Sequence, residues 1–144
     1  MDLRVDIITL AVPNLEEAHA FYVDRLGWEP ALEVAGEVTF LRAGPGRLVA
    51  LFGRHDLERD IGDHERVPPF DLGQLLSSPG EVDATVEAMV AAGAKVRKPP
   101  QRPDFFDGYH AYVEAPEGTV WELVHNPGFH FDSDGAPRFA PAGG

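Results

Sequence analysis

Hydrophobic positions in the first forty residues change from strand-like to helical spacing and back. The apolar run over residues 3–12 predicts a β-strand. Asn14 is placed to cap a helix, with Glu17 at the third helical position as in a capping box. The apolar residues that follow recur at helical spacing: Leu15, Ala18, Phe21, Tyr22 and Leu26. A second strand is expected after Gly27.

The second half of the chain repeats this plan. Ser78 is placed to cap another helix, with Pro79 as its first residue and Glu81 at the third position. The apolar face of this helix consists of Val82, Val86, Met89 and Val90. Gly93 follows, in the position that favours a left-handed residue. The two halves therefore look like two copies of one unit.

Short strand signals follow each helix, and a turn joins the last two of them. The turn is Gly44-Pro45-Gly46 in the first half and Pro116-Glu117-Gly118 in the second. Both halves read as βαβββ modules, which predicts an α+β fold in a single domain. We expect module one at residues 3–53, a linker at 54–69, module two at 70–127 and a C-terminal arm at 128–144.

The linker carries several potential metal donors. Asp60, Asp63, His64 and Glu65 lie close together in the sequence. These residue types bind metals, but their spacing is irregular. A solvated, charged linker with room for one helical turn is the preferred interpretation.

Composition and charge narrow the classes of partner. The net charge is -12, and Lys and Arg are scattered singly, which argues against nucleic acid because phosphate binding needs clustered cations. The absence of cysteine excludes disulfides, thiolate metal sites and cysteine nucleophiles. The N-terminal apolar run is too short for a signal sequence or a membrane span, so we expect a cytoplasmic protein without membrane contact.

Two βαβββ modules, with VPNLEEAHAFYVDRLGW after the first strand and APEGTVWELVHNP near the end, resemble the vicinal oxygen chelate superfamily. This superfamily includes glyoxalase I, extradiol dioxygenases, fosfomycin resistance proteins and bleomycin-binding proteins. The resemblance covers residues 3 to about 127, and WELVHNP is similar to a little-characterised glyoxalase-like branch. It implies two curled, mixed four-stranded sheets that enclose a cleft, with the helices on the outer faces.

Enzymes of the superfamily hold a divalent metal in this cleft through the first and last strands of each module. The four matching positions here are Ile7, Ala50, Gln74 (or Gly73 if the repeat is aligned through its prolines) and Glu122. Ile7 and Ala50 cannot coordinate a metal. The resemblance therefore implies a cleft without a catalytic metal, or with Glu122 and Gln74 as ligands if one is present. A relocated site that uses His110 or a linker residue stays open.

The hairpin around residues 115–119 concentrates polar side chains on one face. Its register places Tyr112 opposite Glu122 and His110 opposite Val124. Glu122, with Tyr112 or His110, is the candidate catalytic group, either as a general base or as a contact for a substrate hydroxyl or amine. The alternative is that Tyr112 and Glu122 form a structural hydrogen-bonded pair. Candidate substrate-binding residues are Ile7, Thr9, Ala50, Phe52, Gln74, Leu76, Phe105 and Phe106.

Three classes of function are compatible with these features. The first is a metal-free protein that binds a small molecule, similar to the drug-sequestering members of the superfamily. The second is an enzyme of lyase, isomerase, hydrolase or dioxygenase type that uses Glu122, with or without a relocated metal. The third is a domain used for assembly through its aromatic arm. A homodimer is expected in each case, because pairing would cover sheet edges and apolar tail residues.

Overall fold

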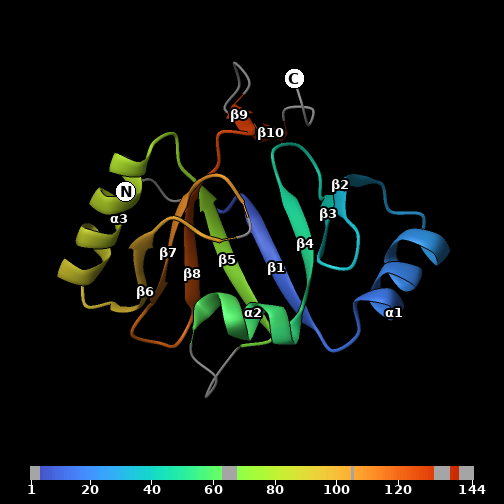
Figure 1. Ribbon diagram of the computed structural model, residues 1–144, viewed down its shortest axis with the longest axis horizontal. Helices are drawn as coiled ribbons and strands as arrows, with labels where there is room; N and C mark the ends of the chain where they lie inside the picture. The colour runs from blue at the N-terminus through green and yellow to red at the C-terminus, as the bar shows by residue number, and fades with distance from the viewer. Residues whose placement is uncertain (1–3, 63–67, 105, 132–136, 140–144) are drawn as a thin grey trace.

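The computed structural model describes residues 4–62, 68–104, 106–131 and 137–139. The first half contains β1 (Ile7–Val12), α1 (Leu15–His19), the π-helix η1 (Ala20–Arg25), β2 (Pro30–Val34), β3 (Val38–Arg42) and β4 (Leu48–Gly53), and α2 (Arg54–Ile61) follows. The second half contains β5 (Phe70–Leu75), α3 (Pro79–Ala91), β6 (Lys95–Gln101), β7 (Tyr109–Glu114) and β8 (Val120–His125), followed by β9 (Phe129–Phe131) and β10 (Pro137–Phe139). Figure 1 shows α3 at one end of the row of strands and α1 at the other, with α2 between them.

The main strands form one continuous sheet in the order β2-β3-β4-β1-β5-β8-β7-β6. Within each module the first and last strands are parallel, as β1 with β4 and β5 with β8. The modules meet through the antiparallel pair of β1 and β5. Each module therefore has the same strand order when it is followed from the centre outwards. The predicted α+β fold with two βαβββ modules is confirmed.

Both predicted helix starts are confirmed. The side chains of Asn14 and Ser78 accept hydrogen bonds from the backbone N–H groups of Glu17 and Glu81, at 3.0 and 3.1 Å. These caps satisfy backbone donors that a helix start leaves without partners. Beyond the caps the helices differ, because α3 buries two valines whereas α1 passes into η1 and neither of these segments has a buried residue.

The two faces of the sheet carry different layers. The cluster between α3 and the sheet consists of Val82, Val86, Ala111, Val113 and Leu123. Alternate residues of the strands point to the opposite, concave face. This face carries one cluster of Ile7, Leu48, Ala50, Leu75 and Val124 and another of Ala11, Leu57, Ile61, Tyr112 and Val120. Residues from both clusters line one cavity.

The segment predicted to be a solvated linker begins with a helix that packs against the concave face. Leu57, Asp60 and Ile61 of α2 are buried on one side of the helix. Leu57 and Ile61 pack in the same cluster as Tyr112. The prediction of a solvated linker was therefore wrong for residues 54–61, which close one end of the cavity.

Two other predicted features fall partly or wholly beyond the structural description. Asp63, His64 and Glu65 lie outside the described residues. In the C-terminal arm, β9 and β10 pair as antiparallel strands. Across the described ranges, no helix combines the length and the hydrophobicity needed to cross a membrane.

Candidate functional site

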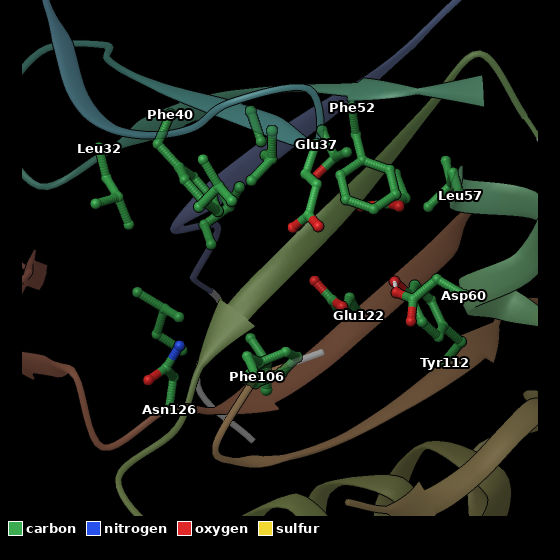
Figure 2. A pocket seen from close by; sticks show the side chains of 18 residues that line it. Leu32, Glu37, Phe40, Phe52, Leu57, Asp60, Phe106, Tyr112, Glu122 and Asn126 are labelled. Carbon is green, nitrogen blue, oxygen red and sulfur yellow. Dashed lines mark hydrogen bonds between the residues drawn. The ribbon is translucent and has the colours of Figure 1, made fainter. Parts of the chain in front are cut away.

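A cavity opens on the concave face, between the two modules and α2 (Figure 2). Its volume is about 190 Å³, whereas one water molecule needs roughly 10–15 Å³. The cavity therefore has room for an organic molecule. Its apolar lining is Ile7, Leu32, Val34, Val38, Phe40, Ala50, Phe52, Leu57, Leu75, Phe106 and Val124. Its polar lining is Thr9, Glu37, Asp60, Asp71, Tyr112, Glu122 and Asn126.

Glu122 enters the cavity from β8. Strand pairing places Leu48, Ile7, Gly73 and Glu122 in one row across four neighbouring strands. Glu122 is the one member of this row whose side chain carries a polar group. That side chain is 17% exposed, and its carboxylate points into the same space as that of Asp60 (Figure 2).

His110 lies beside Glu122 on β7. The predicted register is confirmed, because Tyr112 pairs with Glu122 and His110 pairs with Val124. His110 is fully buried, and its Nδ1 lies 3.5 Å from Oε2 of Glu122. The rings of Phe106 and Tyr112 lie edge-on to the imidazole, each at a centroid distance of 5.6 Å. These rings hold the imidazole in an orientation that faces the carboxylate.

Asp60 reaches the same site from α2. The hydroxyl of Tyr112 donates a hydrogen bond to its Oδ2. Lys98 of β6 donates to the backbone carbonyl of Asp60, and its Nζ lies 3.6 Å from Oδ1. Tyr112 therefore faces Glu122 in the register, as predicted, but its hydroxyl bonds to Asp60. The alternative of a hydrogen-bonded pair of Tyr112 and Glu122 was wrong.

Asp71 is a second buried carboxyl group of the cavity. It lies opposite Thr9 in the β1–β5 pair and accepts a hydrogen bond from the Thr9 side chain. The Asp71 side chain is buried, and its Oδ1 has no hydrogen-bond partner within the described ranges. Sequence reasoning missed Asp71 because it placed Gln74 on the concave face. The two residues are three positions apart in β5, so their side chains point to opposite faces of the sheet.

Burial and mutual repulsion raise pKa values at this site. Loss of hydration raises the pKa of Asp60, and the charge of Glu122 raises it further, although the Tyr112 hydrogen bond opposes the shift. The same two causes, burial first, raise the pKa of Asp71 well above its usual range. Burial, followed by the charges of Glu122 and Asp60, raises the pKa of the Tyr112 phenol well above its usual range. Tyr112 is therefore a hydrogen-bond donor at neutral pH and not a base.

Sequence reasoning also missed Asp60 as part of the site, although a local signal was present. Leu57 and Ile61 are one helical turn apart, and Gly62 follows them with a φ of 81°. An apolar pair at this spacing before a left-handed glycine is typical of an amphipathic helix end. Asp60, three residues after Leu57, then shares the buried face of that helix.

The structure brings most of the predicted cleft residues to the cavity. These are Ile7, Thr9, Ala50, Phe52 and Phe106. Gln74 and Leu76 lie instead in a hollow beside α3, where the amide of Gln74 donates to the carbonyl of Arg4 at 2.7 Å. A shift of one residue along a strand reverses which face a side chain occupies, and the concave face of β5 carries Asp71 and Leu75. Phe105 lies outside the described residues.

The four metal positions of the vicinal oxygen chelate superfamily do not fit a metal here. Ile7, its β4 partner Leu48 and the second superfamily position, Ala50, have no donor atoms in their side chains. The residue paired with Ile7 in β5 is Gly73, and a Cβ atom at Gly73 would lie 3.4 Å from that of Ile7. Glu122 remains as a single carboxylate, whereas transition ions take three or four donors from a protein. Gln74 is on the other face and cannot join Glu122.

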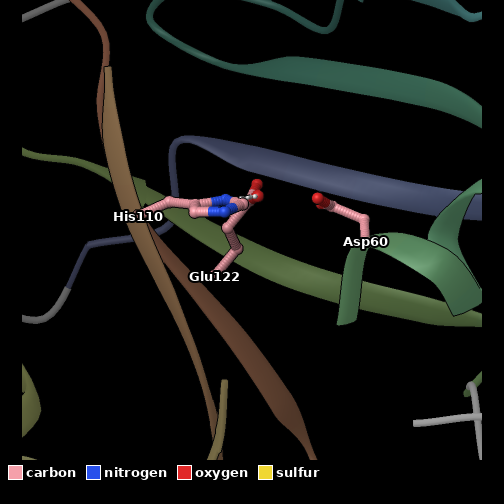
Figure 3. A group of neighbouring side chains, drawn as sticks. All are labelled: Asp60, His110 and Glu122. Carbon is pink, nitrogen blue, oxygen red and sulfur yellow. Dashed lines mark hydrogen bonds and ion pairs between the residues drawn. The ribbon is translucent and has the colours of Figure 1, made fainter. Parts of the chain in front are cut away.

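A different group of donors does converge. Asp60, His110 and Glu122 each offer one ligand atom, and these atoms lie within 4.8 Å of one another. Figure 3 shows the three side chains pointing toward one another from α2, β7 and β8. Two carboxylates and an imidazole have the chemistry to hold a divalent ion. The same groups can accept protons or bind ligand N–H and O–H groups.

A family model for the Glyoxalase/Bleomycin resistance protein/Dioxygenase superfamily matches residues 4–123 of the chain. Curated proteins include no match to the sequence. A solved glyoxalase-related enzyme from Fulvimarina pelagi is 29% identical, with 96% of this chain and 99% of that chain covered and a TM-score of 0.48.

Two further solved structures share the fold at lower identity. A glyoxalase/bleomycin resistance protein/dioxygenase superfamily member from Vibrio splendidus is 20% identical, with 87% of this chain and 100% of that chain covered and a TM-score of 0.58. A protein described as an NAD-dependent benzaldehyde dehydrogenase from Legionella pneumophila is 18% identical, with 83% and 97% covered and a TM-score of 0.68. At these identities the likeness concerns the fold alone.

Proposed function

Since the chain belongs to the Glyoxalase/Bleomycin resistance protein/Dioxygenase superfamily, we propose that it binds a small organic molecule in the cavity between its modules. The observation that carries this proposal is the composition of the cavity wall, which is apolar over most of its area and carries the carboxyl groups of Glu37, Asp60, Asp71 and Glu122. Concave sites of this type, with a few convergent polar groups, are typical of small-molecule binding. Binding does not require a metal at the four superfamily positions.

The charge of the cavity favours one class of ligand. Asp60, Asp71 and Glu122 line it, and none of its described lining residues is Lys or Arg. A carboxylate ligand would be repelled by these groups, whereas an amine or a hydroxyl can donate hydrogen bonds to them. We therefore propose a ligand with an apolar body and a donor group, cationic or neutral, that meets Glu122.

Thermal melts with a panel of small amines, alcohols and acids test this proposal. Protein treated with EDTA should melt at higher temperature with selected amines or alcohols, because a ligand that binds only the folded state stabilises it. Glu122→Gln should reduce this stabilisation. Asp83→Asn, which changes an exposed carboxyl group that accepts from Tyr109, is the control. Stabilisation by acids alone would contradict the proposal.

A second candidate function is an enzyme of lyase, isomerase or dioxygenase type that uses Glu122 for proton transfer. The observation that favours it is the 3.5 Å separation of His110 Nδ1 and Glu122 Oε2, since paired acid and base groups can pass a proton to and from a substrate. Glu122→Gln distinguishes the two functions once a ligand is known. An enzyme turns the ligand over and loses that turnover in the variant while it still binds the ligand. A binding protein leaves the ligand unchanged and binds it more weakly in the variant.

The homodimer and the cytoplasmic location stay predictions. Support for a homodimer comes from partly exposed apolar side chains in module one, namely Phe21, Leu26, Trp28, Leu32 and Val34. Leu32 and Val34 belong to the edge strand β2 and also line the cavity. Light scattering of the purified chain measures its mass in solution, and a monomer at micromolar concentration would contradict the dimer.

A further inference from the structure

We propose that Asp60, His110 and Glu122 form a site for a divalent transition-metal ion at the inner end of the cavity. This site is relocated from the four superfamily positions and shares only Glu122 with them. The ligand atoms lie within 4.8 Å of one another (Figure 3). Two donors of a tetrahedral ion, each about 2.1 Å from it, lie about 3.4 Å apart. A pair of ligand atoms at the 4.8 Å limit must therefore approach by roughly 1.4 Å when an ion binds.

The donor types identify the class of ion. Two ionised carboxylates offset the charge of a divalent cation, and the imidazole favours a first-row transition ion over Mg²⁺ or Ca²⁺. The chain has no cysteine, so ions that require thiolate ligands are not expected. Three protein ligands leave coordination positions open on the cavity side, as catalytic zinc sites do. An oxygen atom or an unprotonated nitrogen atom of an organic ligand, with a free lone pair, can occupy such a position.

Neighbouring side chains hold two of the three donors in place. The Tyr112 hydroxyl donates to Oδ2 of Asp60, and the rings of Phe106 and Tyr112 lie edge-on to His110. Such outer contacts orient metal ligands in proteins. They leave the carboxylate of Asp60 directed at the space between His110 and Glu122 (Figure 3).

Asp71 provides an independent indication of a cation in this cavity. The residue is 1% exposed and lines the cavity, and its Oδ1 has no hydrogen-bond partner within the part of the chain that the structure describes. A buried polar oxygen without a partner is unfavourable. A cation held nearby by Asp60 and Glu122 stabilises this oxygen through its charge.

Lys98 is the group that competes with an ion for Asp60. Its Nζ lies 3.6 Å from Oδ1 of Asp60, and its side chain is 19% exposed. A metal ion at Asp60 is repelled by this ammonium group. Removal of the Lys98 charge is therefore expected to strengthen metal binding, whereas removal of a donor weakens it. If the cluster had a purely structural role, removal of the Lys98 charge would not strengthen metal binding.

The metal site and the proposed small-molecule function can fail separately. Metal binding is measured without an organic ligand, and the ligand melts use protein treated with EDTA. If no metal binds, the organic ligand can still be tested. If no organic ligand is found, the metal titration still stands.

The test is a titration of the untagged, EDTA-treated full chain with Co²⁺, followed by visible absorption, and with Zn²⁺, followed by calorimetry. We expect one ion per chain and Co²⁺ absorption bands that report nitrogen and oxygen ligands. Asp60→Asn and Glu122→Gln should each weaken Zn²⁺ binding by at least about tenfold, in line with the loss of metal contacts. Lys98→Met should strengthen it severalfold.

Asp56→Asn is the matched control, because Asp56 is a partly exposed carboxyl group on the same helix and pairs with Arg59. It should bind Zn²⁺ as the natural chain does. Circular dichroism checks that each variant folds, and Lys98→Met keeps all three donors if Asp60→Asn does not fold. The proposal is overturned if the natural chain binds no ion stoichiometrically, or if folded Asp60→Asn and Glu122→Gln bind as tightly as Asp56→Asn.

Discussion

Module one and module two have the same strand order but supply opposite walls to one cavity. The wall from module one is mainly hydrocarbon, with Ile7, Phe40, Ala50 and Phe52, and the one carboxylate among its described lining residues is that of Glu37. The wall from module two, with Asp60 added by α2, carries Asp71, Tyr112 and Glu122, and His110 lies beside them. The two modules thus contribute backbone walls of the same topology. The chemical character of each wall depends on the side chains that its strands carry. Such a cavity can orient a ligand that is apolar at one end and polar at the other.

The largest expected effect comes from a charge on the apolar wall. Ile7 is 4% exposed and lies in the same row as Glu122. In Ile7→Asp, a buried carboxylate would replace a hydrocarbon side chain two strands away from Glu122, and we expect a loss of at least about 3 kcal/mol in the free energy of unfolding. Urea denaturation at pH 7 measures this loss. Ile7→Val is the control and should lose about 1 kcal/mol. Equal losses in the two variants would show that this wall tolerates charge.

The next effect concerns the polar wall. Tyr112→Phe removes the hydroxyl that donates to the buried Asp60. A hydrogen bond to a charged group contributes about 1.5–3 kcal/mol, so we expect a loss of that size in the free energy of unfolding. Tyr109→Phe removes an exposed hydrogen bond to Asp83 and should change stability by less than about 0.5 kcal/mol. If Tyr112→Phe lost as little stability as Tyr109→Phe, the hydrogen bond from Tyr112 to the buried Asp60 would not stabilise the fold.

Ligand binding should separate the two walls. Phe40→Ala removes part of the apolar wall, and we expect it to weaken all hits from the ligand panel by roughly tenfold, whatever their polar group, because it removes buried apolar area. Glu122→Gln should instead reduce the preference for amines over acids. Calorimetry with an amine and the acid of the same carbon skeleton measures both effects. The comparison of the walls fails if Phe40→Ala changes this preference and Glu122→Gln does not.

The smallest expected effect is a change in thermal stability when the carboxyl group of Asp71, which lies near other carboxyl groups, is replaced by an amide. Burial raises the pKa of Asp71 in the folded state, so its protonated form is favoured there. This contribution to stability is complete below the unfolded pKa and is lost as pH rises through the folded pKa. Asp71→Asn avoids this loss of stability, because an amide stays uncharged at every pH. We expect its Tm at pH 7 to exceed that of the natural chain by roughly 2–5 °C.

The Tm advantage of Asp71→Asn should shrink as the pH falls toward 4, because both chains are then uncharged at this position. Asp107→Asn, at an exposed position, should show neither the gain nor its pH dependence. A gain that stays constant between pH 4 and pH 7 would exclude the charge of Asp71 as its cause. Thermal melts across this pH range provide the measurement.

The fold was predictable because its signals are local. The caps at Asn14 and Ser78 and the repeated order of elements follow from residue types within a few positions of each other. The pairing of Tyr112 with Glu122 was also predictable, since a short turn fixes the register of a hairpin. These features led to the superfamily and to Glu122.

Parts of the site were not predictable in the same way. The face of Gln74 depends on the parity of β5, and an error of one residue placed it in the cavity instead of Asp71. Asp60 was assigned to solvent from the charge of its neighbours, although Leu57 and Ile61 bury the helix that carries it. The meeting of Asp60 with His110 joins segments fifty residues apart, and no local pattern encodes such a contact.

The measurement that tests the central claim most directly is NMR of the ¹⁵N-labelled chain with matched pairs of fragments, each pair sharing one apolar body and differing as an amine or an acid. The account predicts that amines shift the backbone signals of Ala50, Phe52 and Glu122 together, because both walls of the cavity contact the same ligand. The paired acids should shift them less or not at all. Shifts confined to residues outside the cavity, or equal shifts with acids and amines, would contradict the account.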